Sequence, residues 1–167
     1  PIDFEGDIIK AAKEGKLTSI QYLVEQCHAS VEVRDNYGRT PLHFASENGY
    51  ILIVKYFIEQ CHANAEAKSV LRTPPLHFAS FGGHIEVVKY LIEQCNVNVE
   101  AKNNQRRTPL HNASMNGNIK VIKYLIEQCH ANVEAEDDFG WTPLHIASNY
   151  GHIEVVKYLV EQCHANV

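Results

Sequence analysis

The sequence lacks a long apolar run: none of its uninterrupted hydrophobic stretches approaches the roughly 18 residues that a membrane-spanning helix needs. Basic residues are not in excess either, because 15 Lys and Arg stand against 20 Asp and Glu and leave a formal net charge of -5. The N-terminal residues have neither the basic head nor the apolar middle of a signal peptide. These absences argue against a membrane partner and against a nucleic-acid partner.

Catalytic motifs are missing as well. The sequence contains no Gly-rich phosphate loop, no nucleophile elbow and no His-Glu-x-x-His pair. Its five cysteines are an odd number, so a framework of disulfides would leave one over. We therefore expect a non-enzymatic protein without cofactor or metal, in a reducing intracellular compartment such as the cytoplasm. The first residue is Pro1 instead of Met, so we expect a piece of a longer or processed chain.

What the sequence does contain is a strict repeat. Its cysteines lie 34 residues apart throughout, at Cys27, Cys61, Cys95, Cys129 and Cys163. Glycine, histidine and tyrosine recur at the same interval, and no insertion breaks it. A fixed period of about 20–50 residues is typical of a solenoid, in which one supersecondary unit stacks on the next. We expect a monomer and a single domain of residues 1–167, with units at approximately 1–34, 35–68, 69–102, 103–136 and 137–167.

Each unit carries the signals of two short helices. In the last unit, Thr142 suits an N-cap, Pro143 suits the first helical position, and Gly151 suits a left-handed helix end. A second helix is expected from about Ile153 to Gln162. Its buried stripe is expected to consist of Ile153, Val156, Leu159 and Val160. The polar connection 132–140 is short and rich in turn residues, which indicates a hairpin-like excursion.

Three segments carry a family resemblance: 38–46 (GRTPLHFAS), 107–114 (RTPLHNAS) and 140–148 (GWTPLHIAS). They resemble the ankyrin-repeat family, and the resemblance covers the whole chain. It implies an all-α repeat solenoid of helix–turn–helix units with projecting β-hairpin-like loops. It also implies a protein-interaction function, with partners bound in a concave groove. The family usually repeats about every 33 residues and ends its second helix with Gly, whereas two residues, Cys and then His or Asn, occupy that place here.

The recurrent Cys-His pairs have a structural and a chemical interpretation. A helix end needs a residue that tolerates positive φ, which fits His28, His62, His130 and His164, and Asn96 in the third unit. Cys in the preceding position is a small apolar plug. A metal or redox site is the competing hypothesis, and stoichiometric zinc in the purified chain would establish it. We favour helix termination, since stacked helices about 8–10 Å apart hold neighbouring cysteines too far apart for a disulfide.

Two further columns of residues also recur every 34 residues. One of them consists of histidines, and the resemblance implies that each histidine side chain ties a Thr to the adjoining backbone. These residues are His43, His77, His111 and His145. The other column has two interpretations, packing with the hydroxyl at a wet edge or a binding ladder on the outer face: Tyr22, Tyr56, Tyr90, Tyr124 and Tyr158.

Positions that differ between units are the candidates for recognition, because the framework of a solenoid repeats and a binding surface need not. Variation is greatest at the hairpin tips and at the ends of the first helices, which line the concave groove that the resemblance implies. The candidate partner-binding residues are Tyr37, Arg39, Leu71, Arg72, Phe81, Arg106, Arg107, Met115, Phe139, Trp141 and Tyr150. Aromatic, Met and Arg side chains are enriched in interface hot spots. Arg72, Arg106 and Arg107 predict a protein or peptide partner with Asp, Glu or a C-terminal carboxylate opposite them.

A passive scaffold or spacer segment is the alternative function, with an effector outside this chain. The last unit bears on this choice, because residues 152–156 duplicate interior residues 84–88 without polar replacements. A unit at the end of a solenoid is expected to carry a polar outer face. We therefore expect further units or another domain beyond Val167, or a frayed end.

The third unit departs from the others. Pro74 replaces the capping Thr, and Arg72 replaces the turn Gly. Pro74 has no side-chain oxygen, so we expect Thr73 to cap one residue early, with Pro74 and Pro75 both in the first turn of the helix. The hairpin tip of this unit is expected to be distorted.

Overall fold

The computed structural model describes residues 4–166, so the first and last residues of the outermost expected units, 1–3 and 167, lie outside the described part. Helices follow one another in pairs along the chain. The pairs are α1 (Phe4–Lys13) with α2 (Leu17–Glu25), α3 (Pro41–Glu47) with α4 (Ile51–Lys55) and the π-helical turn η1 (Tyr56–Gln60), α5 (Pro75–Gly82) with α6 (Ile85–Glu93), α7 (Pro109–Met115) with α8 (Ile119–Glu127), and α9 (Pro143–Asn149) with α10 (Ile153–Glu161). Over residues 4–166 the chain has helices and loops without strands, which confirms the expected all-α solenoid.

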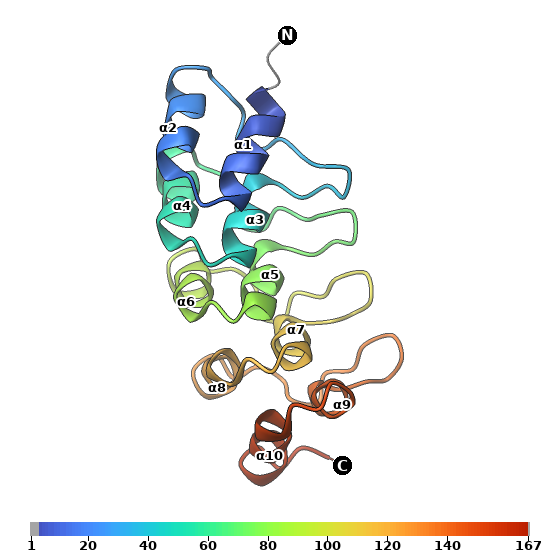
Figure 1. Cartoon of the computed structure of the whole chain (residues 1–167). Helices are drawn as coiled ribbons and strands as arrows, with labels where there is room; N and C mark the ends of the chain where they lie inside the picture. Colours follow the sequence, from blue (N-terminus) through green and yellow to red (C-terminus); the bar gives the residue numbers. More distant parts are fainter. Residues whose placement is uncertain (1–3, 167) are drawn as a thin grey trace.

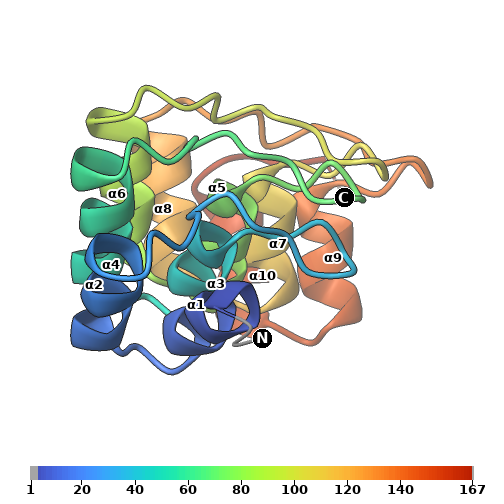
Figure 2. The same ribbon diagram turned by 90° about the horizontal axis from the view of Figure 1, so that it is seen from above.

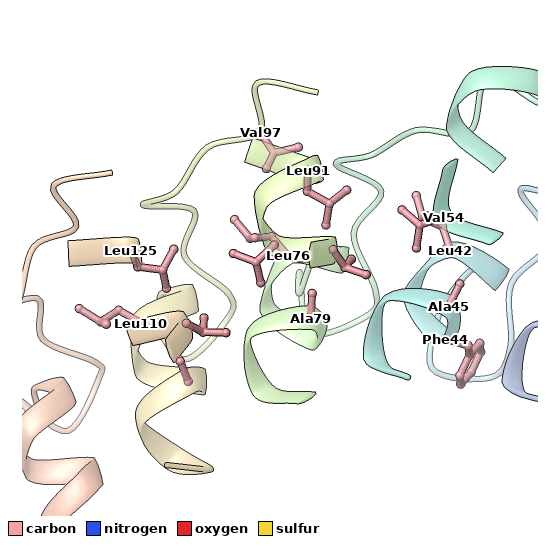
Figure 3. Packing of buried hydrophobic residues seen from close by; sticks show 14 of the residues in the cluster. Leu42, Phe44, Ala45, Val54, Leu76, Ala79, Leu91, Val97, Leu110 and Leu125 are labelled. Atoms are coloured by element: carbon pink, nitrogen blue, oxygen red, sulfur yellow. The ribbon is translucent and has the colours of Figure 1, made fainter. Parts of the chain in front are cut away.

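The helices form two columns (Figure 1). The first helix of each pair stands in one column and the second helix in the other, and the loops between pairs project from the first column. The core runs along the stack between the columns (Figure 3). Leu42, Leu76 and Leu110 come from the first helices, and Leu91 and Leu125 come from the second. Each is fully buried, which stabilises the fold by about 1.5–3 kcal/mol per side chain.

The first helices begin as the Thr-Pro signal predicts. Thr40 has extended backbone, with φ -89° and ψ 166°, and Pro41 occupies the first helical position. The backbone N–H of Thr40 donates to Nδ1 of His43 at 3.0 Å, and the Thr40 hydroxyl lies 2.9 Å from the same nitrogen. Thr108 with His111 and Thr142 with His145 repeat this arrangement. Because Pro has no N–H to lose, the helix starts without an unsatisfied donor at that position.

The second helices end in left-handed residues. The φ angles lie between 52° and 55° at His28, His62, Asn96, His130 and His164. This confirms that the residue after each recurrent Cys terminates a helix, and Asn performs the same function as His. Left-handed backbone is tolerated by few residues other than Gly, and Asn and His are among those enriched there.

The third unit differs from the expectation in two respects. Pro74 itself occupies the N-cap, with φ -83° and ψ 167°, and only Pro75 lies in the first turn of α5. Extended backbone suits Pro, so the helix starts at the same place as in the other units and Thr73 is not the cap. The tip is not distorted either: Ser69 N–H donates to Thr73 O and Arg72 N–H donates to Ser69 O, as their counterparts do in the other loops. Arg72 reaches this geometry by adopting a φ of 55°.

The buried stripe of α10 was predicted only in part. Leu159 is fully buried, but Ile153 is 69% exposed and Val156 and Val160 are only half-buried. Val155 faces the core instead and is 1% exposed. In an interior unit both neighbouring valines, such as Val87 and Val88 of α6, are fully buried. The difference arises because no described helix packs on the far side of α10.

The second helix of the second unit contains a feature that the repeat pattern did not indicate. Its last turn widens into η1, where the Cys61 N–H donates to Tyr56 O, five residues back. Phe57 lies in this turn and is fully buried, at the position that Leu91 and Leu125 hold in the following units. We attribute the wider turn to the larger ring, because a packed core accommodates added volume by shifting backbone.

Candidate interaction surface

Four loops project from the first-helix column and are here called fingers: finger 1 (34–39), finger 2 (68–73), finger 3 (102–107) and finger 4 (136–141). Figure 2 shows these loops running in the same direction on one side of the stack. Each finger closes on itself. In finger 1, Asp35 N–H donates to Arg39 O at 3.0 Å and Gly38 N–H donates to Asp35 O at 2.9 Å. The same two bonds close the other three fingers.

Neighbouring fingers are joined by backbone hydrogen bonds. The Val70 N–H donates to Tyr37 O at 2.9 Å, which ties finger 2 to finger 1. Asn104 N–H donates to Leu71 O at 2.9 Å, and Asp138 N–H donates to Gln105 O at 3.0 Å. The four fingers therefore form one continuous platform, whose tips are held in register by the main chain.

A second set of bonds fixes the base of fingers 2, 3 and 4. Nε2 of His43 lies 3.1 Å from Thr73 O, Nε2 of His77 lies 2.9 Å from Arg107 O, and Nε2 of His111 lies 3.1 Å from Trp141 O. In His43 and His111, Nδ1 accepts from the backbone N–H of the capping Thr, so each ring is neutral and donates through Nε2. This confirms the structural interpretation of these histidines.

Burial keeps these rings uncharged. Desolvation lowers the pKa of His43 and of His77 to about 4. The pKa of His111 is also lowered by burial. A histidine whose pKa lies this far below neutral pH is uncharged at physiological pH and serves as a hydrogen-bonding group, not as a general base. His145 is exposed, since no finger is described beyond finger 4.

His77 has an unsatisfied atom. Its Nδ1 is buried without a hydrogen-bond partner, because Pro74 supplies neither the N–H nor the hydroxyl that Thr40 and Thr108 give to their histidines. The sequence signal for this defect was the replacement of the capping Thr by Pro74.

Most of the apolar candidates are exposed on the finger platform and beside it. Tyr37, Leu71 and Phe139 stand at the tips of fingers 1, 2 and 4 and are more than 60% exposed. Trp141 and Phe81 are each 37% exposed, Tyr150 is exposed, and Met115 is half-buried. Val70 at the tip of finger 2 is as exposed as Leu71, and sequence reasoning did not include it. Its position among the variable tip residues could have identified it.

The four candidate arginines fall into two kinds. Arg39 donates to Oδ2 of Asp35 through Nε (2.9 Å) and Nη2 (2.8 Å), and its guanidinium lies over the Phe44 ring at 4.5 Å. Arg107 donates to Oδ2 of the buried Asp137 at 3.0 Å. These two arginines therefore already have carboxylate partners within the chain. Arg72 and Arg106 are exposed at the finger tips.

The carboxylates of Asp35 and Asp137, which pair with Arg39 and Arg107, are held ionised. Burial raises the pKa of Asp137, but the N–H groups of Trp141 and Phe139 and the Arg107 guanidinium outweigh this effect and leave the pKa below its ordinary value. Burial also raises the pKa of Asp35, but the Arg39 guanidinium and the N–H groups of Arg39 and Tyr37 outweigh this effect and lower the pKa. Both carboxylates stabilise the backbone of their own fingers through these hydrogen bonds.

The outer face of the second-helix column carries the recurrent tyrosines. The hydroxyls of Tyr90, Tyr124 and Tyr158 donate to a glutamate of the preceding unit at 2.8–2.9 Å, and Tyr56 donates to Glu25 at 3.2 Å. Burial, together with the carboxylate, raises the pKa of Tyr90. These four hydroxyls are used within the stack, which supports the packing interpretation for them, whereas Tyr22 in the first unit is 62% exposed.

The five cysteines are free thiols, one in each unit, and all are half-buried. Burial raises the pKa of Cys61, Cys95, Cys129 and Cys163, which favours the thiol over the reactive thiolate. Among the described residues, no group of three or more His, Cys, Asp or Glu side chains is placed to hold a metal ion.

The chain belongs to the ankyrin-repeat family. The family's sequence model, described as ankyrin repeats in three copies, matches residues 8–103 and again 76–167, which together cover most of the chain. Ankyrin repeats are generally protein–protein interaction modules and are typically non-enzymatic. A comparison with curated proteins gave no match. Within the described residues, no helix is long and apolar enough to cross a bilayer.

Proposed function

We propose that this chain is a non-enzymatic interaction module that holds a protein or peptide partner on the finger platform and the adjoining ends of the first helices. The observation that carries the proposal is the set of apolar side chains that are exposed on backbone fixed by hydrogen bonds. Tyr37, Leu71 and Phe139 contribute little to the core at their level of exposure. Rows of exposed apolar side chains are typical of binding surfaces.

The platform is prepared for binding before a partner arrives. Each finger is closed by its own bonds and tied to its neighbour, and a histidine holds the base of fingers 2, 3 and 4. A partner therefore does not have to order these loops, and the entropic cost of association is lower than for flexible loops. This property supports a binding function at the fingers.

Phe81 and Trp141 are the proposed anchors. Both are partly buried, so their rings are held in place while one side stays accessible. The backbone of Phe81 accepts from Asn116 Nδ2 at 3.0 Å, and Trp141 N–H donates to Oδ1 of Asp137 at 3.0 Å. Rigid aromatic side chains at the centre of a contact are the usual hot spots.

The charged contacts are proposed for Arg72 and Arg106. Both are exposed and lie in the middle two fingers, where they suit a carboxylate of the partner. Arg39 and Arg107 instead hold Asp35 and Asp137 and serve the fingers themselves. The proposal includes an intracellular, cytoplasmic setting, which the five free thiols support.

The test is a pull-down from the native cell followed by affinity measurement with the captured partner. Alanine at Phe81 and at Trp141 is expected to weaken binding by about 2 kcal/mol each. The matched control is the pair Leu52→Ala and Ile153→Ala, which removes exposed apolar side chains from the outer helices. Full affinity of the Phe81→Ala/Trp141→Ala protein would show that the platform is not the binding site.

A further inference from the structure

The fingers change sign along the stack. Fingers 1 to 3 carry exposed cations and finger 4 carries exposed acids. The exposed cations are Arg34, Lys68, Arg72, Lys102 and Arg106. The exposed acids of finger 4 are Glu136 and Asp138.

The change is abrupt. Finger 3 has Lys102, Arg106 and Arg107 and no acid, while finger 4 has only acidic charges. The single acid of fingers 1 to 3 is Asp35, and Arg39 holds it. The basic fingers also stand out against the composition of the whole chain, whose formal net charge is -5. A local excess of basic side chains on a protein of the opposite net charge points to recognition by charge complementarity.

The spacing of the fingers sets a scale for the partner. Each finger has two backbone legs, and neighbouring fingers are joined by main-chain bonds, so at about 4.8 Å per leg successive fingers are roughly 10 Å apart. An extended peptide advances about 3.3 Å per residue and passes one finger every three residues or so. Neighbouring fingers are also about one Debye length apart at 0.1 M salt, so the charge of each finger acts mainly on the part of the partner that lies against it.

We infer that the partner is a protein segment of two signs, acidic where it crosses fingers 1 to 3 and basic where it meets finger 4, and that this order fixes its direction on the platform. The inference rests on the proposed function and adds the chemistry of the partner to it. The reversed direction places acid against Glu136 and Asp138 of finger 4 and base against Arg34 of finger 1. Like charges across an interface are strongly disfavoured. Tyr37, Leu71 and Phe139 supply the apolar contacts between the charged ones.

A nucleic acid fits this surface less well. Its phosphates would match the cations of fingers 1 to 3 but meet Glu136 and Asp138 at finger 4. A uniform polyanion has no basic part to place there, whereas a polypeptide can carry both signs within a dozen residues.

The experiment selects binders from a displayed library of random 15-residue peptides on the immobilised chain. We expect selected peptides to carry Asp or Glu over a stretch of roughly nine residues, with Lys or Arg about three residues beyond one fixed end. The charge-reversed protein Glu136→Lys/Asp138→Lys should bind such a peptide at least tenfold more weakly. Replacing the basic residues of the peptide by Glu should restore the affinity for that protein. The matched control is Glu86→Lys/Glu154→Lys, the same change of charge on exposed outer-helix positions, and it should leave binding unchanged.

The outcomes separate the inference from the function beneath it. Peptides that depend on Phe81 and Trp141 but have no charge order, or that ignore the Glu136→Lys/Asp138→Lys change, would overturn the inference and leave the proposed function standing. Failure to select any peptide that depends on Phe81 and Trp141 would overturn the inference, and the proposed function would then be decided by the pull-down with the Phe81→Ala/Trp141→Ala protein. Single-stranded DNA that binds as tightly as the peptides, and is released by Arg72→Ala/Arg106→Ala, would also overturn the inference. Unchanged circular dichroism of every variant would show that the fold is retained.

Discussion

Nε2 of His43 lies 3.1 Å from the carbonyl oxygen of Thr73, thirty residues further along the chain, and so joins the start of one unit to the base of the next finger. The neutral ring is needed on the other side of the imidazole, where Nδ1 of the same histidine accepts from the Thr40 N–H. The stability of the stack is therefore linked to the protonation of its buried histidines. His77 and His111 make the equivalent link in the next two units.

The stack is predicted to lose stability in mild acid. Burial lowers the pKa of His43 and His77 to about 4, while an unfolded histidine titrates near 6.5. The unfolded chain therefore binds more protons in this window, so the stabilisation is complete above pH 6.5 and falls as the pH drops toward 4. The slope is about 1.4 kcal/mol per pH unit for each histidine. Urea unfolding at pH 7, 6, 5 and 4.5 measures it, and a free energy of unfolding that is level between pH 6.5 and 4.5 would contradict the neutral-ring account.

Pro74→Thr is predicted to stabilise the third unit. Pro74 has nearly the same backbone angles as Thr40, so Thr fits without strain and returns an N–H and a hydroxyl to the buried Nδ1 of His77. The free energy gained by giving the buried Nδ1 a partner exceeds the stabilisation that is lost because Thr leaves the unfolded chain more flexible than Pro does. We expect a net increase of about 1 kcal/mol in the free energy of unfolding. Thermal and urea unfolding measure the change. The reciprocal Thr108→Pro should lower stability, and a Pro74→Thr protein no more stable than the parent would refute the assignment of the defect.

Arg72 and Arg106 are predicted to cost stability at the places where they serve binding. They adopt φ angles of 55° and 57°, at the position that Gly38 and Gly140 hold in the other fingers. Because left-handed backbone is unfavourable for a residue with a Cβ, Arg106→Gly is expected to raise the free energy of unfolding by about 0.5–1 kcal/mol. The same change should weaken the binding of an acidic partner. Gly140→Ala, where a Cβ has open space, is the converse control and should lower stability by a similar amount. An Arg106→Gly protein that is less stable would argue for an unrecognised contact of that side chain.

Much of the fold could be read from the period of 34, since registered repeats locate the helix starts at Thr-Pro, the helix ends at His or Asn, and the core leucines. The exceptions have local physical causes. Pro74 tolerates the extended N-cap backbone, so α5 is not capped one residue early by Thr73 as expected. The turn around Phe57 is wider than in the other units, which we attribute to the volume of the ring and which the spacing of the repeat does not report. Ile153 is exposed because burial in a solenoid is shared between neighbouring units.

The sequence was sufficient to predict which exposed residues make up the candidate surface, but not which of its side chains form ion pairs with one another. Variation between units led to the exposed Tyr37, Leu71 and Phe139. It could not show that Arg39 and Arg107 are held by Asp35 and Asp137, because the first pairing depends on the closure of a finger and the second crosses 30 residues. The continuous backbone bonding of the fingers was likewise invisible in the sequence.

The most direct test of the account is backbone amide NMR of the labelled chain, titrated with the captured partner or a selected peptide. The account predicts chemical-shift changes in the four fingers and around Phe81, Met115 and Tyr150, with the outer surfaces of α2, α6, α8 and α10 unchanged. Changes concentrated on those outer helices, with the fingers unaffected, would contradict it.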